Sequence, residues 1–351
     1  MKHTPEVALS YGPLHQLAMG PLKAALLNCA IKLKVFDLLS QARAAGEVAA
    51  ALGLHPENTR RFLDALTTID LLRKQGATYC NQPIAQAFLV SGSLSSVAAL
   101  LLQTQNAGLN PLDKLERLLT HGPDADGQVM DFADEKIWTK EVQSSAGWVF
   151  GGVGPLVAEM VAGLPGFASF EKMLDMGCGH GAFTLYILEK NPKLHGVLLD
   201  RPAVLAAAAA FVDAYQAGDR VSYRPGDYLA EGIGEGYDLV FASATLNFAI
   251  GNLPALLGKV LDALKPGGWF VSFQDGMTNQ QTKPETMLGA VIPSMMMGHD
   301  YCFPQGMIAK AAIDVGFQST RSRTVDTPIG AMDIDMCQKG DRGCPPETKE
   351  S

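Results

Sequence analysis

The stretch Leu174-Asp175-Met176-Gly177-Cys178-Gly179-His180-Gly181-Ala182-Phe183 joins a short apolar run to an acid, three closely spaced glycines and a helical pattern. Glycine lets the backbone turn sharply and lets a ligand or helix approach it closely. An acid at the carboxyl end of a strand lies in the crevice where open α/β sheets bind ligands. The stretch therefore predicts a strand, a ligand-binding turn and a helix.

Short apolar runs alternate with helical patterns from residue 172 onward, which is typical of a parallel sheet with crossover helices. We expect seven strands, at residues 172–176, 194–199, 221–225, 239–243, 269–273, 319–326 and 332–337. The fold class is therefore α/β, with a Rossmann-like seven-stranded sheet.

Two further acids follow strands of this sheet. Asp200 ends the second strand, where an acid can accept hydrogen bonds from both ribose hydroxyls of an adenosine. Gly226-Asp227-Tyr228 follows the third strand, where a carboxylate can take an adenine amino group. These positions predict a ligand that contains adenosine.

The glycine pattern distinguishes between adenosine ligands. Nicotinamide enzymes carry Gly-x-Gly-x-x-Gly, which places a pyrophosphate on a helix N-terminus. Here the third glycine comes one residue early, and Asp175 would repel a pyrophosphate. A cationic ligand with an amino group, such as S-adenosylmethionine, fits these residues better.

The N-terminal part has a different pattern. Apolar residues recur at helical spacing over 14–29, and helices at 47–52 and 58–72 precede a short hairpin, which together indicate a winged helix. A winged helix binds DNA or serves in packing and dimerisation. The acids of the 58–72 helix nearly cancel Arg60 and Arg61, and the chain carries a net charge of −8, so we expect dimerisation and no nucleic-acid partner.

Composition and length set further limits. The 351 residues predict about two domains: a winged-helix dimerisation domain at 1–120, linker helices at 121–165, a cofactor-binding domain at 166–339 and a loose tail at 340–351.

Six scattered cysteines without a CxxC pair favour reduced thiols, a cytoplasmic location and no metal site. The longest apolar run, 203–212, is shorter than the roughly 18 residues of a membrane span, so we expect no membrane span.

The motifs resemble those of class I S-adenosylmethionine-dependent methyltransferases, namely 175–181, Asp200, Gly226-Asp227 and Leu264-Lys265-Pro266-Gly267-Gly268. The order of domains narrows the resemblance to the O-methyltransferase group that includes the acetylserotonin, plant phenylpropanoid and bacterial polyketide enzymes. It covers about residues 14–339 and implies S-adenosyl-L-methionine as cofactor, a small-molecule methyl acceptor and a homodimer. The cofactor-binding residues expected from the motifs and the resemblance are Asp175, Gly177, Cys178, Gly179, Gly181, Asp200, Arg201, Gly226, Asp227, Tyr228 and Ser243.

The sequence departs from this family at the catalytic base. The family carries a Leu-His-Asp-Trp run after the fourth strand, but here residues 244–248 place Asn247 at the position of the histidine. Asparagine cannot take up a proton at neutral pH, although it can hold a hydroxyl group. We therefore consider His299 as a substitute base, against the alternative of a loop histidine paired with Asp300, and Asp275 as a further catalytic candidate.

The acceptor end of the site is expected to be apolar. Methionines at 295–297 are either flexible core residues or part of a broad acceptor pocket. The expected pocket residues are Trp148, Phe150, Met287, Met295, Met296 and His299. We expect methyl transfer to a small, largely apolar acceptor, aromatic or polycyclic; the alternatives are a C- or N-methyltransferase of the same fold, or a cofactor-binding regulator without catalysis.

Overall fold

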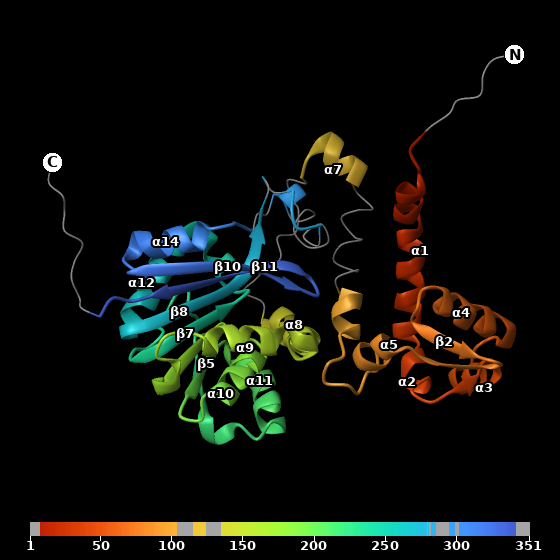
Figure 1. Ribbon diagram of the computed structural model, residues 1–351, viewed down its shortest axis with the longest axis horizontal. Coiled ribbons are helices and arrows are strands. Elements are labelled where there is room, and N and C mark those ends of the chain that lie inside the picture. The colour runs from red at the N-terminus through yellow and green to blue at the C-terminus, as the bar shows by residue number, and fades with distance from the viewer. Residues whose placement is uncertain are drawn as a thin grey trace, which may run out of the picture. The chain divides into compact units, whose positions relative to one another are not determined.

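The computed structural model describes residues 8–103, 115–123, 135–278, 280, 282–285, 295–298 and 302–341. The chain forms two compact units, Met1–Leu102 and Gln103–Ser351 (Figure 1). The boundary predicted at residue 120 lies inside the second unit, and so do the helices predicted as a linker.

The first unit contains a helix-turn-helix and a small hairpin. Its helices include α1 (Gly12–Lys32), α2 (Val35–Leu38), α3 (Ala45–Leu52), α4 (Pro56–Thr68) and α5 (Pro83–Phe88). Strands β2 (Leu72–Gln75) and β3 (Thr78–Asn81) form the hairpin, and β1 (Arg43–Ala44) pairs with β3. The predicted N-terminal helical domain is thus present, with a core of its own that includes Phe36, Leu63 and Tyr79.

Local signals explain where α4 begins. Pro56 occupies the first turn, where its missing N–H costs nothing, and the His55 Nδ1 atom accepts a hydrogen bond from the Asn58 N–H at 3.3 Å. Arg60 pairs with Glu57 and Asp64, and Arg61 pairs with Glu57, so the cations of α4 are neutralised on their own helix.

The second unit is built on one twisted sheet in the order β10-β11-β8-β7-β4-β5-β6. The predicted seven-stranded sheet is confirmed. The strands are β4 (Lys172–Met176), β5 (His195–Asp200), β6 (Val221–Pro225), β7 (Tyr237–Ser243), β8 (Leu264–Met277), β10 (Ser319–Thr327) and β11 (Gly330–Gln338). β11 runs antiparallel to β8 and β10, the other neighbouring pairs are parallel, and a short β9 (Phe303–Pro304) pairs with the end of β8.

Helices cover both faces of this sheet (Figure 1). The core on one face includes α9 (Gly154–Ala162) and α10 (Ala182–Lys190), and the core on the other face includes α12 (Leu253–Ala263) and α14 (Met307–Val315). Further helices are α7 (Leu115–His121), α8 (Glu135–Trp148), α11 (Pro202–Ala214), the π-helix η1 (Val149–Val153) and the 3-10 helices η2 (Phe167–Ser169), η3 (Gly218–Arg220) and η4 (Leu246–Asn252).

One helical stretch of the described chain, Ser144–Ala162, is long and apolar enough to cross a membrane by length and composition. The expectation that no segment reaches that length was therefore too strict. Val149, Val153, Val157 and Val161 of this stretch are buried in the core against the sheet. A buried core helix of a globular protein passes the same test of length and composition, and Ser144–Ala162 packs as such a helix.

Candidate functional site

The order of the strands places a topological switch point, where open α/β sheets form their ligand crevice, at the carboxyl ends of β4 and β7. The chain runs from β4 outward through β5 and β6, and then returns to the other side of β4 with β7. Ligands of open α/β sheets bind outside the carboxyl ends of the strands at such a switch point.

The glycine loop after β4 turns at this crevice. Gly177, Gly179 and Gly181 have φ angles of 70°, 53° and 68°, a region that favours glycine. The N–H groups of Gly177 and Cys178 both donate to the carbonyl oxygen of Leu199, at 2.9 and 3.2 Å. The loop is therefore fixed to the end of the neighbouring strand β5.

Asp200 joins the three loops that follow β4, β5 and β6. Its Oδ2 atom accepts a hydrogen bond from the Gly179 N–H at 2.9 Å, and its Oδ1 atom accepts one from the Arg201 N–H at 2.8 Å. Its carbonyl oxygen accepts one from the Gly226 N–H at 3.1 Å. Burial raises the pKa of the Asp200 carboxyl group, and the two backbone donors oppose that effect.

Asp175 is buried on β4, the strand next to β5, which ends at Asp200. Its Oδ2 atom accepts a hydrogen bond from the Thr184 hydroxyl on α10 at 2.7 Å. The pKa of Asp175 is raised to about 7: burial raises it most, the Thr184 hydrogen bond opposes this rise, and the nearby Asp200 adds to it. A group in this condition gains or loses its proton near neutral pH and responds to any charge brought into the crevice.

The loop after β6 brings Asp227 and Tyr228 to the same edge. The Asp227 Oδ1 atom accepts a hydrogen bond from the Leu229 N–H at 2.9 Å. Tyr228 is buried, and its hydroxyl lies 2.5 Å from Thr245 Oγ1 and 3.1 Å from the Thr245 carbonyl oxygen. Burial raises the Tyr228 pKa well above its usual range, so this hydroxyl stays protonated.

Two buried side-chain oxygens at the end of β7 have no hydrogen-bond partner among the residues that the structure describes. They are Ser243 Oγ, on the last residue of the strand, and Asn247 Oδ1, in η4. Buried polar atoms without partners are uncommon in folded proteins and mark places that water or a ligand can occupy. The predicted residues at the crevice thus leave acceptor atoms open beside the glycine loop.

Aromatic rings lie at the same edge of the sheet, on the face that α9 and α10 cover. The Trp148 ring stacks on Phe273 at 6.2 Å between centroids and meets Phe183 edge-on at 5.7 Å. The Phe150 ring instead packs between α10 and α11, parallel to Tyr215 at 5.3 Å and near Phe211. Trp148 therefore faces the sheet, whereas Phe150 belongs to an outer aromatic cluster.

The other acceptor and catalytic candidates are only partly described. Met295 packs against Met277 and Cys302, and Met296 is half-buried. Asp275 pairs with Met332 in the sheet, and its side chain lies outside the described part of the structure. Met287 and His299 lie outside the described residues altogether.

Three matches to known proteins give the chain its family. Residues 15–91 match the family model of the O-methyltransferase dimerisation domain, and residues 174–270 match that of a methyltransferase domain. Acetylserotonin O-methyltransferase of Mus musculus is 30% identical over 285 residues, which cover 73% of this chain and 70% of that protein. The chain belongs to the O-methyltransferase family.

Other members of this family are similar over most of the chain. The N,N-dimethyltransferase OxyT of Streptomyces rimosus is 28% identical over 280 residues, or 77% of this chain and 79% of that protein. The solved structure of human N-acetylserotonin methyltransferase in complex with SAM has the same fold, with a TM-score of 0.77 at 19% identity, over 97% of this chain and 100% of that chain.

This methyltransferase uses S-adenosylmethionine as its methyl donor. The open acceptor atoms of Ser243 and Asn247, the glycine loop and the carboxylates of Asp175, Asp200 and Asp227 suit a cationic nucleoside with an amino group. Residues that were not predicted also shape the site of the methyltransferase. They are Thr184, Gln274 and Thr245, together with Trp138 and Val142 of α8, which lie against Phe248 and Gly179.

His180 and Cys178 of the glycine loop are buried, and their side chains contact other parts of the fold. The His180 Nδ1 atom accepts a hydrogen bond from the Ala182 N–H at 3.1 Å, and burial lowers the pKa of His180 to about 4. Cys178 packs against Leu198 and Leu205, and burial raises its pKa. At neutral pH, His180 is therefore a neutral imidazole bound to the first N–H of α10, and Cys178 is a protonated thiol.

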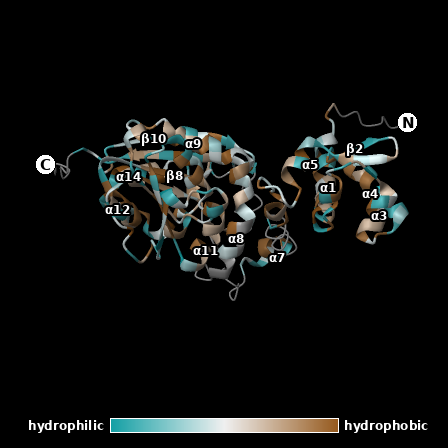
Figure 2. Cartoon of the chain, turned by 90° about the horizontal axis from the view of Figure 1, so that it is seen from below, coloured by the Kyte–Doolittle hydropathy of each residue, from teal (hydrophilic) through white to brown (hydrophobic). Residues whose placement is uncertain are grey.

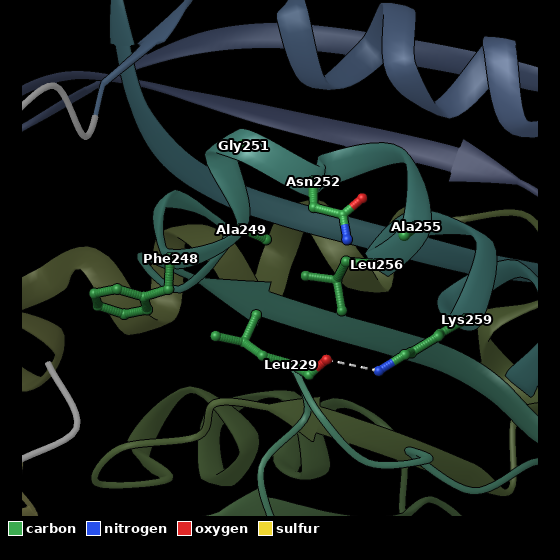
Figure 3. A pocket seen from close by; sticks show the side chains of 8 residues that line it. All are labelled: Leu229, Phe248, Ala249, Gly251, Asn252, Ala255, Leu256 and Lys259. Atoms are coloured by element: carbon green, nitrogen blue, oxygen red, sulfur yellow. Dashed lines mark hydrogen bonds between the residues drawn. The ribbon is translucent and has the colours of Figure 1, made fainter.

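A cavity of about 270 Å³ opens beside η4 and α12 (Figure 3). It is lined by Leu229, Phe248, Ala249, Gly251, Asn252, Ala255, Leu256 and Lys259. The Lys259 ammonium group donates to the carbonyl oxygens of Tyr228, Leu229 and Glu231, at 3.2, 2.9 and 3.1 Å. The Lys259 ammonium group therefore holds the loop after β6 in place.

Proposed function

We propose that this methyltransferase methylates an oxygen or nitrogen atom of a small, largely apolar acceptor, without a proton acceptor at position 247. The observation that carries this proposal is Asn247, whose buried Oδ1 atom has no partner in the described structure. An amide oxygen accepts a hydrogen bond but not a proton at neutral pH. Asn247 would therefore hold the hydrogen of an acceptor N–H or O–H group and orient the atom that is methylated.

We propose that the loops at the crevice hold the cofactor. Asp200 would take the ribose hydroxyls, Asp227 the adenine amino group, and the loop of Gly177–Gly181 with Asp175 the methionine end. Bound S-adenosylmethionine would supply a methyl group on a positively charged sulfur: an in-line acceptor atom would bond to the methyl carbon as the carbon–sulfur bond breaks, S-adenosylhomocysteine would leave, and the acceptor's proton would pass to water. Holding the two reacting atoms in line is worth several kcal/mol of the barrier, about 7–11 in favourable cases, so the residues act mainly by positioning.

The acceptor side favours a flat and apolar molecule. Trp148 stacks over Phe273 beside the open Ser243 oxygen, and Met295 lies with Met277 and Cys302 near the end of β8. Aromatic and methionine side chains offer broad apolar surfaces of this kind. We propose an aromatic or polycyclic acceptor, with Met287, His299 and Asp275 as further candidates to contact it.

Transfer to nitrogen is a second candidate. A neutral amine already has the lone pair that attacks the methyl group, so it needs no general base before the transfer. The amide at position 247 and the relative named as an N,N-dimethyltransferase both favour this possibility.

Kinetics of Asn247→Ala test the proposal. The purified enzyme is incubated with S-adenosylmethionine and a small-molecule extract, and the methylated product is identified by mass and by the chemical shift of its methyl group. If Asn247 only orients the acceptor, Asn247→Ala lowers the rate by about 10-fold and leaves the shape of the pH–rate profile unchanged. A profile that loses an ionisation near neutral pH in this variant would refute a purely orienting role.

The enzyme is further proposed to be a homodimer in the cytoplasm. Its first unit matches a dimerisation domain, and several large apolar residues of α1 are exposed. The described cysteines Cys29, Cys80, Cys178 and Cys337 are free thiols, as expected for a reducing compartment.

A further inference from the structure

The segment between β7 and η4 has an irregular backbone that one side chain holds in place. Ala244 has a φ angle of 49°, which is uncommon for a residue with a Cβ atom. With its amide oriented so that the oxygen faces these donors, buried Gln274 accepts hydrogen bonds from the N–H groups of Ala244, Thr245 and Leu246, at 3.0, 3.0 and 3.2 Å. Three consecutive donors thus converge on one oxygen of β8.

Thr245, in the middle of this segment, reaches two other loops with its side chain. It is only 4% exposed, and its Oγ1 atom shares a hydrogen bond of 2.5 Å with the Tyr228 hydroxyl after β6. A Cβ atom on Gly177 would lie 2.2 Å from Thr245 Oγ1, so the Thr245 side chain sits directly on the backbone of the glycine loop after β4.

We propose that Thr245 is a positioning residue that fixes Asn247 relative to the cofactor loops. The Thr245 carbonyl oxygen accepts a hydrogen bond from the Phe248 N–H at 3.4 Å, so Asn247 lies within the turn that Thr245 begins. The hydroxyl of Thr245 ties this turn to Tyr228, and its packing ties the turn to Gly177. A shift of any one of the three loops therefore shifts the amide that faces the acceptor.

This inference concerns the cofactor loops and does not depend on the identity of the acceptor. It can be measured with S-adenosylhomocysteine, the product form of the cofactor, and on the ligand-free full-length protein. Thr245→Val removes the hydroxyl and keeps the volume, Thr245→Ser keeps the hydroxyl, and Tyr228→Phe removes the partner. Thr59→Val in α4 makes the same chemical change at a buried threonine of the first unit and serves as the control.

Two readouts test the inference. In Thr245→Val, we expect amide hydrogen exchange over residues 244–248 to be about 5- to 10-fold faster and the dissociation constant of S-adenosylhomocysteine to rise about 3- to 10-fold. Thr245→Ser should stay within about 2-fold of the wild type, and Thr59→Val should change neither quantity. The double variant Thr245→Val/Tyr228→Phe should be no weaker than Tyr228→Phe alone, because Tyr228→Phe already removes the contact that Thr245→Val removes, together with the hydrogen bond to the Thr245 carbonyl oxygen.

Other outcomes overturn the inference. Effects of Thr245→Val and Tyr228→Phe that multiply in the double variant would show that the two hydroxyls act independently. A Thr245→Ser variant as impaired as Thr245→Val would show that packing alone matters. If Thr245→Val does not fold, unchanged exchange at 244–248 in Tyr228→Phe is sufficient to reject the inference. A wild type that does not bind S-adenosylhomocysteine would contradict the cofactor assignment, while the exchange data would still decide the role of Thr245.

Discussion

The Asp200 carboxylate accepts two backbone hydrogen bonds, one from the glycine loop and one from the start of α11. An adenosine ribose would add its hydroxyls to the same group. We expect Asp200→Ala to weaken S-adenosylmethionine binding about 10- to 100-fold, because it removes a charged acceptor and loosens the loop. Isothermal calorimetry checks this, with the exposed Asp213→Ala on α11 as control; equal affinities of the two variants would contradict the role of Asp200.

Asp175 makes stability depend on pH. Its pKa is raised from 3.8 to about 7 in the folded protein, so between these values the folded state holds a proton that the unfolded state has lost. The stabilisation from Asp175 is then fully present below about pH 4 and is lost as the pH rises to about 7. Between pH 4 and 7, the free energy of unfolding of the wild type should fall relative to that of Asp175→Asn, by at most about 4 kcal/mol.

Denaturant unfolding of the wild type and Asp175→Asn at several pH values measures this difference. Other carboxyl groups titrate in both proteins, so only the difference between the two curves reports Asp175. A difference that does not change with pH would mean that the folded-state pKa of Asp175 is not raised.

Both the backbone angles and the close packing of the glycine loop require glycine. Gly177 has a φ angle of 70°, and a Cβ atom there would collide with Thr245. We expect Gly177→Ala to lower the free energy of unfolding by about 2–4 kcal/mol and to weaken cofactor binding. Gly258→Ala in α12, where a Cβ atom meets nothing within 4 Å, should instead raise stability by about 0.5–1 kcal/mol. Thermal and denaturant unfolding compare the two, and a Gly177→Ala protein as stable as Gly258→Ala would refute the collision.

Most elements of the sheet could be predicted because they are buried and bounded by glycine, proline or acids. The strands at β4 and β6 were predicted with the bounds that they have, Lys172–Met176 and Val221–Pro225. β8 begins five residues earlier than the predicted 269, because Lys265-Pro266-Gly267-Gly268 reads as a turn in sequence but continues the strand here. β9 is two residues long and has no periodicity that a sequence could reveal.

The placement of single acids at the carboxyl ends of strands, as for Asp175, Asp200 and Asp227, could be predicted from the sequence. The site was not predictable where a contact joins distant segments. Gln274 and Thr245 are polar residues beside buried runs, and nothing in their local sequence indicates that they meet the loop after β7 and Tyr228. The π-helix η1, with Gly152 at a φ of 128°, likewise depends on packing rather than on local preference.

At the scale of the whole molecule, the first unit leaves apolar side chains open to solvent. Leu14 and Leu17 of α1 are 68% and 70% exposed, whereas the end of α1 packs into the core of the unit. Hydrophobic residues lie along α1 in Figure 2. Exposed apolar side chains gathered on one element mark a surface for protein contact.

If this surface joins two copies, then charge placed on it separates them. We expect the wild type to sediment as a dimer at micromolar concentration and Leu14→Glu/Leu17→Glu to sediment as a monomer, because the carboxylates would have to be buried without partners. Leu94→Glu changes a leucine of the same unit that is 61% exposed but lies outside α1, so it should remain a dimer. Sedimentation equilibrium distinguishes these states. A dimeric double variant would place the interface elsewhere, and a monomeric wild type would contradict the homodimer itself.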